Sequence, residues 1–98
     1  MEITGILVAM TPMKVREYTD RQGEKKNFKE AQVLIETGHD TYLVEMTGEY
    51  AEKLDAGNYE IGARYALKLD GRVAQAKDQS GETRYFPHLE CKKIFKLS

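Results

Sequence analysis

Residues 41–57 read TYLVEMTGEYAEKLDAG, and this stretch decides the fold. In its first half apolar and polar side chains alternate, which is the period of a half-buried β-strand. Residues 28–37 alternate in the same way, and a turn at Gly38-His39-Asp40 joins the two segments. The sequence therefore predicts two consecutive strands. Their expected inward side chains are Ala31, Val33, Ile35, Tyr42, Val44 and Met46.

The second half of the quoted stretch predicts one short helix over residues 48–56. Thr47 is a suitable cap, and Glu49 and Lys53 have the i,i+4 spacing of an ion pair on a helix surface. Gly57 is placed to end the helix. We therefore expect a strand that leads directly into a short helix.

Strand-like sequence also lies on both sides of this centre. Residues 3–10 are apolar and β-branched, whereas residues 14–27 are charged and predict a long loop or an exposed hairpin. Alternation resumes after Gly62, with an expected bend or bulge at Asp70-Gly71, and residues 78–81 predict a turn. A final strand over residues 85–97 loses its alternation at residues 92–95, which indicates a bulge. Its expected packing residues are Leu89, Cys91, Ile94, Phe95 and Leu97.

This order of elements predicts an all-β fold: a five-stranded Greek-key barrel with one short helix between the third and fourth strands, the layout of the oligonucleotide/oligosaccharide-binding (OB) fold. A generic α+β sheet with one helix is the alternative. A chain of 98 residues without linker, repeat or low-complexity tract predicts a single domain over residues 1–98.

Composition narrows the class of protein further. With 41% hydrophobic and 32% charged residues the chain is typical of a soluble globular domain. The longest apolar run, residues 6–10, is too short to span a membrane. The opening Met1-Glu2-Ile3-Thr4 leads into a strand and not into a secretory leader, and Cys91 stands alone, so we expect a cytoplasmic protein.

The net charge of −1 conceals a segregation of charge. Residues 14–29 hold six basic and three acidic side chains, and residues 30–60 hold one basic and eight acidic ones. Residues 61–98 hold eight basic and four acidic ones. One interpretation is that the two basic segments line one side of the fold; the other is a solvated surface whose charges happen to cluster.

The second half of the chain resembles bacterial and phage single-stranded DNA-binding proteins. The resemblance rests on Gly48-Glu49-Tyr50-Ala51-Glu52 at the helix start, on Gly62, and on Asp78-Gln79-Ser80-Gly81-Glu82-Thr83-Arg84-Tyr85, within residues 44–97. It implies an OB-fold barrel that binds single-stranded nucleic acid, DNA in preference to RNA. It also implies a homo-oligomer that serves replication, recombination or a mobile element.

Three positions depart from that family. The family stacks bases on aromatic rings at the positions of Thr41, Thr47 and Ala76. The strand that contains Thr41 and Thr47 also carries Glu45 on its outward side. Stacking is worth about 1–3 kcal/mol per base. The alternative function is therefore a protein–protein interaction module that has kept the barrel and lost its nucleic-acid face.

Single-strand binding needs a basic groove for the phosphates and aromatic rings for the bases. The first charged segment and the last hairpin supply both residue types; the alternative for the first segment is a mobile, solvated loop without a ligand. The candidate nucleic-acid-binding residues are Lys14, Arg16, Tyr18, Arg21, Lys25, Lys26, Phe28, Lys29, Arg72, Lys77, Arg84 and Tyr85.

Other chemistry is poorly supported. His39 and His88 lack the spacing of metal ligands, and no phosphate loop or nucleophile motif occurs. Cys91 on an apolar strand is expected to be a small buried hydrophobe. We therefore expect a protein that is not an enzyme and uses neither metal nor cofactor.

Overall fold

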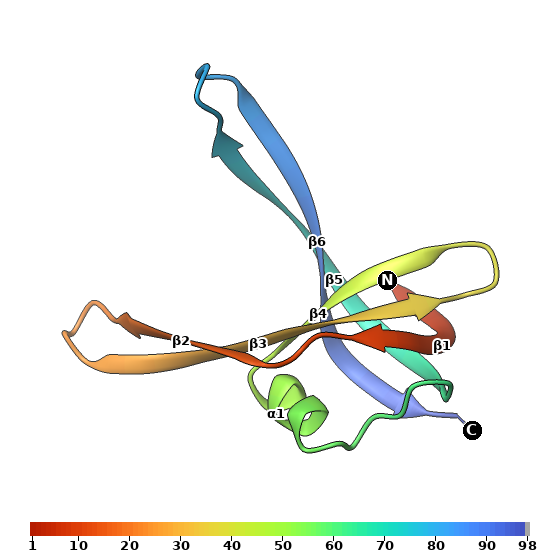
Figure 1. The fold of residues 1–98 in the computed structure, drawn as a ribbon. Helices are drawn as coiled ribbons and strands as arrows, with labels where there is room; N and C mark the ends of the chain where they lie inside the picture. The colour runs from red at the N-terminus through yellow and green to blue at the C-terminus, as the bar shows by residue number, and fades with distance from the viewer. Residues whose placement is uncertain (98) are drawn as a thin grey trace.

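A computed structural model describes residues 1–97, in which one sheet and one helix account for the regular structure. The strand β1 pairs with β5 on one side and with β3 on the other, so that β1, β5, β6, β4 and β3 form a closed ring (Figure 1). The remaining strand, β2, lies outside the ring and pairs with β3. The elements are β1 (Glu2–Met10), β2 (Lys14–Thr19), β3 (Lys25–Glu36), β4 (Thr41–Thr47), α1 (Glu49–Asp55), β5 (Arg64–Lys77) and β6 (Thr83–Lys96).

The ring confirms the predicted five-stranded barrel with a helix between its third and fourth strands, β4 and β5. An open α+β sheet is excluded because the pairing of β1 with β3 leaves no free edge in the ring. Helix α1 covers one end of the barrel and contributes Ala51 and Leu54 to the core.

The barrel interior is filled by side chains from every ring strand. The alternation expected for β3, β4 and β5 is confirmed, although Tyr42 of β4 is only half-buried. Leu89 of β6, which was also expected to pack inward, is half-buried as well. The buried side chains are Ile3, Leu7, Ala31, Val33, Ile35, Val44, Met46, Ala51, Leu54, Tyr65, Leu67, Leu69 and Cys91.

The end of β6 corrects one expectation. Phe95 and Leu97 were predicted to pack inward, but both are exposed. Cys91 pairs with Leu69 and Lys93 pairs with Lys68, so Lys92 is the extra residue of a β-bulge, where one was predicted. Because the bulge shifts the alternation by one residue, Ile94 turns toward the core and Phe95 turns outward. The strand β5, in contrast, continues through Asp70-Gly71 without a break.

Helix α1 differs from the prediction in its N-terminal cap. Thr47 does not cap it: the N-cap is Gly48, whose φ of 56° and ψ of −124° suit glycine, and no side chain caps the helix. The C-terminal end is as expected. The N–H groups of Gly57 and Asn58 donate to the carbonyls of Leu54 and Lys53, the pattern of a Schellman motif.

The expected ion pair between Glu49 and Lys53 is absent from the contacts of the described residues. The Lys53 Nζ instead lies 5.8 Å from the centre of the Tyr50 ring, in cation–π geometry. The first turn still carries acidic residues, which suits the positive end of the helix dipole.

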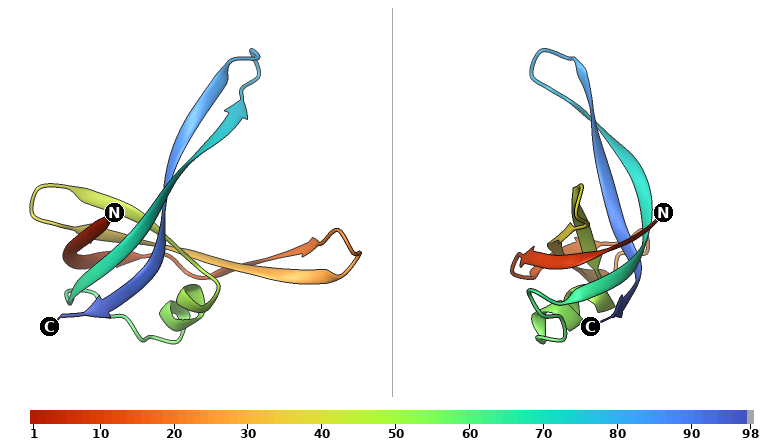
Figure 2. Two further views of the ribbon diagram at one scale, coloured as in Figure 1. Left: turned by 180° about the vertical axis from the view of Figure 1, so that it is seen from behind. Right: turned by 90° about the vertical axis from the view of Figure 1, so that its right-hand side faces the viewer.

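Two β-hairpins project from the barrel in different directions (Figures 1 and 2). We call the hairpin of β2 and β3, residues 14–29, the first arm, and the distal part of β5 and β6, residues 71–88, the second arm. The charged segment is thus the exposed hairpin, one of the two predicted alternatives. The Cα radius of gyration is 15.3 Å, against the about 13 Å typical of a compact chain of this length. The arms account for the excess.

Candidate nucleic-acid interface

The outward side of the barrel continues onto one side of each arm. Side chains alternate along a strand, and residues paired in register point the same way. Since Ala31, Val33 and Ile35 face the core, Phe28 and its partner Arg16 lie on the outward side. By the same rule, alternate residues of β5 and their register partners on β6 lie on the outward side of the second arm. We call this continuous side the outer face, and the reverse side of each arm the opposite face.

The predicted site residues are divided between these two faces. The outer face carries Lys14, Arg16, Tyr18, Lys26, Phe28, Arg72 and Arg84. The opposite face carries Lys25, Lys29, Lys77 and Tyr85, and Arg21 lies in the turn of the first arm. The basic segments therefore project as two separate arms, each with basic side chains on both of its faces.

A groove follows the outer face of β3 and β4 between the two arms. Its first part lies at the base of the first arm, lined by Lys14 and Glu30 among others. Its second part reaches the second arm, where Phe86 and His88 line it together with Leu43 of β4. The two parts share Gln32 and Glu45, which are register partners on β3 and β4 and form the floor between them.

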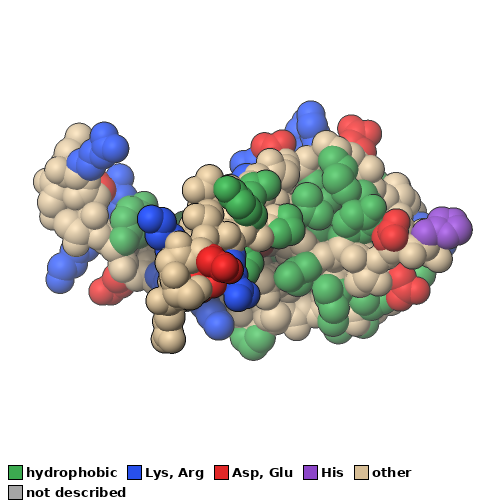
Figure 3. Space-filling model, turned by 90° about the horizontal axis from the view of Figure 1, so that it is seen from above, with side chains coloured by type: hydrophobic (Ala, Val, Ile, Leu, Met, Phe, Trp, Pro, Cys, Tyr) green, Lys and Arg blue, Asp and Glu red, His purple; other side chains and the backbone are tan. Residues whose placement is uncertain are grey.

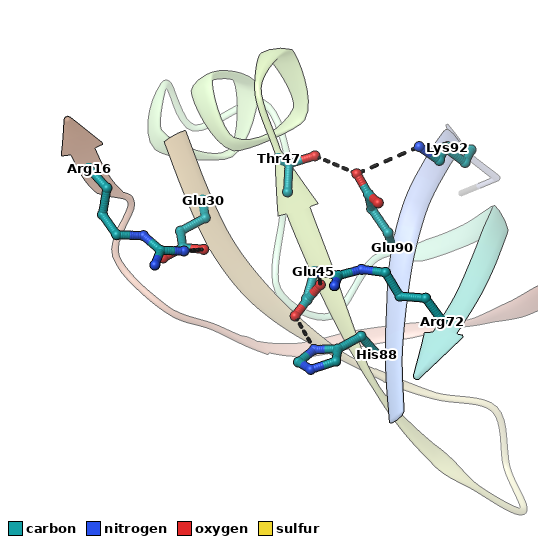
Figure 4. Close-up of polar contacts among 8 residues, drawn as sticks. All are labelled: Arg16, Glu30, Glu45, Thr47, Arg72, His88, Glu90 and Lys92. Atoms are coloured by element: carbon teal, nitrogen blue, oxygen red, sulfur yellow. Dashed lines mark hydrogen bonds and ion pairs between the residues drawn. The ribbon is translucent and has the colours of Figure 1, made fainter. Parts of the chain in front are cut away.

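The floor carboxylate of Glu45 is held from two sides (Figure 4). The Nη2 of Arg72 donates to its Oε2 at 3.3 Å, and the Nδ1 of His88 lies 2.5 Å from its Oε1. The Glu45 side chain is 20% exposed. Because each carboxylate oxygen has a fixed neighbour, Glu45 is oriented, and Arg72 is partly neutralised.

Two further outward carboxylates are engaged in the same way (Figure 4). Glu30 accepts from the Nη2 of Arg16 at 2.8 Å. Glu90 accepts from the Oγ1 of Thr47 at 2.9 Å and lies 3.6 Å from the Nζ of Lys92. A phosphate that approaches Arg16 or Arg72, at the bases of the two arms, must therefore compete with a carboxylate.

Farther along the arms, some cations are paired with carboxylates and others are not. Lys26 pairs with Asp20 at 3.3 Å and Arg84 with Asp78 at 3.2 Å, both at the arm tips. On the opposite face, Lys29 pairs with Glu52 of α1. Among residues 1–97, no ion pair forms at Lys14, Arg21, Lys25 or Lys77.

Aromatic rings are exposed beside these cations. Tyr18 and Phe28 lie on the outer face of the first arm, and the Cζ of Arg16 is 5.7 Å from the centre of the Phe28 ring. Seen from above, the arm that projects to the left carries several Lys and Arg side chains (Figure 3). The outer face of the second arm presents Phe86, 47% exposed, which sequence reasoning missed. Tyr85, which the sequence analysis predicted to bind nucleic acid, lies on the opposite face.

The three positions that lack stacking residues all lie on the outer face. Thr41 and Thr47 belong to β4, and Thr47 uses its hydroxyl to bind Glu90. Ala76 lies in the second arm opposite Arg84, and the next outward residue beyond Arg84 on β6 is Phe86. Phe86 is therefore a diagonal neighbour of Ala76 and supplies an aromatic ring close to the vacant position.

No group of three or more His, Cys, Asp or Glu side chains in residues 1–97 is arranged to hold a metal ion. No helix in the described part of the chain is long and apolar enough to cross a membrane.

The closed ring, the helix between β4 and β5 and the two arms together define an OB-fold barrel of the type found in single-stranded DNA-binding proteins. Two crystal forms of Rim1, a mitochondrial single-stranded DNA-binding protein from S. cerevisiae, are similar to the chain. The first has a TM-score of 0.60 and 16% identity, with 99% of this chain and 92% of that chain covered. The second has a TM-score of 0.55 and 15% identity over the same shares. No family model and no curated protein matches the chain.

Proposed function

We propose that the chain binds single-stranded nucleic acid, DNA in preference to RNA, without sequence specificity. The observation that carries the proposal is the outer face, where a groove on the barrel leads to two arms that each present an exposed phenylalanine beside a cation. Phosphates would contact the cations, and bases would stack on Tyr18, Phe28 and Phe86. Similarity to the Rim1 structures supports the proposal because Rim1 is a mitochondrial single-stranded DNA-binding protein.

The biological setting belongs to the same proposal. The resemblance to bacterial and phage proteins favours a role in replication, recombination or a mobile element. A homo-oligomer in the cytoplasm, acting without metal, cofactor or enzymatic activity, is the form in which we expect the protein to work.

The test is a fluorescence anisotropy titration with a labelled mixed-sequence oligonucleotide longer than the about 4–16 nucleotides that one OB fold covers. We expect single-stranded DNA to bind more tightly than the same sequence as RNA or as a duplex, and the affinity to fall as salt rises. Phe86→Ala should weaken binding at every salt concentration. Phe95→Ala is the matched control, because Phe95 is 59% exposed but lies on β6 away from the groove.

A specific observation favours a second candidate, the protein–protein interaction module. Glu30, Glu45 and Glu90 occupy the barrel part of the outer face, where phosphates would have to pass. If no oligonucleotide binds at low salt, the nucleic-acid proposal is wrong and the interaction module replaces it.

A further inference from the structure

Both arm tips are built from the same nine-residue pattern. The first reads DRQGEKKNF over residues 20–28 and the second reads DQSGETRYF over residues 78–86. Counted from the first residue, Asp, both patterns have Gly three positions later, Glu four positions later, a basic residue six positions later and Phe eight positions later. The expectation that the chain contains no repeat is therefore corrected at this short scale.

The backbone-to-backbone hydrogen bonds of the two tips correspond one to one. In the first, the N–H of Asp20 donates to the carbonyl of Glu24 at 2.9 Å and the N–H of Gly23 donates to the carbonyl of Asp20 at 3.1 Å. In the second, Asp78 donates to Glu82 at 3.0 Å and Gly81 donates to Asp78 at 3.1 Å. Both are three-residue hairpin loops with glycine in the left-handed region, at φ of 81° and 84°.

In each tip the aspartate fixes the loop and the basic residue. The Oδ1 of Asp20 accepts from the N–H groups of Gln22 and Glu24, and Oδ2 pairs with Lys26. Asp78 repeats this with Ser80, Glu82 and Arg84. Backbone hydrogen bonding, chiefly from Glu24, lowers the pKa of Asp20, and the Ser80 hydroxyl is the main cause of the lowered pKa of Asp78. Both carboxylates therefore stay ionised at neutral pH.

The basic residue and the phenylalanine of each pattern are two positions apart on one strand and so share the outer face. Lys26 and Phe28 form this pair on the first arm, and Arg84 and Phe86 form it on the second. Phe28 is 37% exposed and Phe86 47%. In the second arm the residues opposite are Ala74 and Ala76, which leave the Phe86 ring open.

We infer that the two arm tips are equivalent nucleotide-binding elements that grip one strand at two points. Each would bind a phosphate through its cation, in competition with the tip aspartate that pairs with that cation, and would stack a base on its phenylalanine. The inference rests on the proposed function and adds to it: binding is bivalent, so a strand long enough to reach both arms gains from the second, intramolecular contact.

The test compares an oligonucleotide of about 4 nucleotides with one of about 16, the range of site sizes for one OB fold. With the short strand, which occupies one arm at a time, Phe28→Ala or Phe86→Ala should each weaken binding about twofold at most, because an equal site remains, and the double variant should abolish it. With the long strand each single variant should weaken binding about 5- to 150-fold, the equivalent of the about 1–3 kcal/mol of one stacking contact. Phe95→Ala should change neither.

Phe28→Leu and Phe86→Leu repeat the experiment with the apolar side chain kept, and circular dichroism checks that the arms remain folded. The inference is overturned if one variant abolishes binding of the short strand while the other has no effect, because the arms would then not be equivalent. It is also overturned if the single variants weaken the long strand no more than the short one. If the unmodified protein binds neither strand, the proposed function itself fails.

Discussion

At the scale of single residues, Cys91 shows how far position decides chemistry. Its thiol is buried in the core beside Leu69 and donates weakly to the carbonyl of Lys93 at 3.5 Å. Burial, reinforced by the nearby Glu90 carboxylate, raises the pKa of the Cys91 thiol to about 11. The thiol is therefore neutral at physiological pH and is a packing group, as its place on an apolar strand predicted.

A pH prediction follows for Cys91. In the unfolded chain the thiol ionises near its ordinary pKa of 9.0, whereas in the folded chain it keeps its proton until about pH 11. Above pH 9 the unfolded state binds fewer protons, so the free energy of unfolding should fall as pH rises from about 9 to 11. Urea unfolding at pH 8, 9 and 10 would measure this, and Cys91→Ala should show a shallower decline. Equal declines in the two proteins would contradict the assignment.

Prediction of single residues from the sequence succeeded where burial dictates the residue type and failed where a residue distant in the sequence competes for a side chain. Val33, Ile35 and Val44 were predicted to be buried because alternation leaves them only one side of a strand. Thr47 is a good cap by type, but its hydroxyl donates to Glu90 of β6, a contact between residues 43 positions apart. Nothing local in the sequence indicates such a long-range competitor.

At the scale of elements, the barrel closes because β1 can approach two strands at once. Gly5 pairs with Tyr65 of β5, and a Cβ atom added to it would clash with the Glu36 carbonyl and lie 2.8 Å from the Ile35 Cγ2 of β3. Only glycine permits this approach. The closure was expected from the order of elements, but the glycine that allows it was not identified.

Gly5→Ala should therefore destabilise the fold by about 1–3 kcal/mol, the usual cost of overpacking. Gly71→Ala is the matched control, since its added Cβ would meet only Leu89, at an ordinary 3.6 Å. Thermal or urea unfolding of both variants gives the comparison. If the two lose the same stability, the tight contact between β1 and β3 does not hold the ring closed.

The arms mark the limit of sequence prediction at this scale. A strand in the core reveals its register through its apolar residues, but residues 14–29 have too few of them to say which side faces outward. The residues predicted to bind nucleic acid consequently came from both the outer face and the opposite face of the arms. Phe86 was missed, although the pattern it shares with Phe28 was present in the sequence and would have indicated it.

At the scale of the whole molecule, the closed barrel is the base from which two hairpins extend. Isolated two-stranded hairpins are only marginally stable in water, so their three-residue turns, fixed by Asp20 and Asp78, are needed to hold them. The molecule measures 43 × 33 × 21 Å along its principal axes. Such a shape offers a ligand the groove and both arms rather than one enclosed pocket.

The central claim is that nucleic acid follows the outer face, and two triple variants of equal charge test it most directly. Lys14→Ala/Arg16→Ala/Lys26→Ala removes cations from the outer face. Lys25→Ala/Lys29→Ala/Lys77→Ala removes the same charge from the opposite face.

The measurement is the affinity for a labelled single-stranded oligonucleotide over a series of salt concentrations. Each phosphate contact contributes about 0.7 to the slope of log affinity against log salt, so two or three lost contacts reduce the slope by about 1.4–2.1. We predict weaker binding and this shallower slope for the outer-face variant, with the opposite-face variant close to the unmodified protein. Equal losses in both variants, or unmodified affinity and slope in the outer-face variant, would contradict the claim.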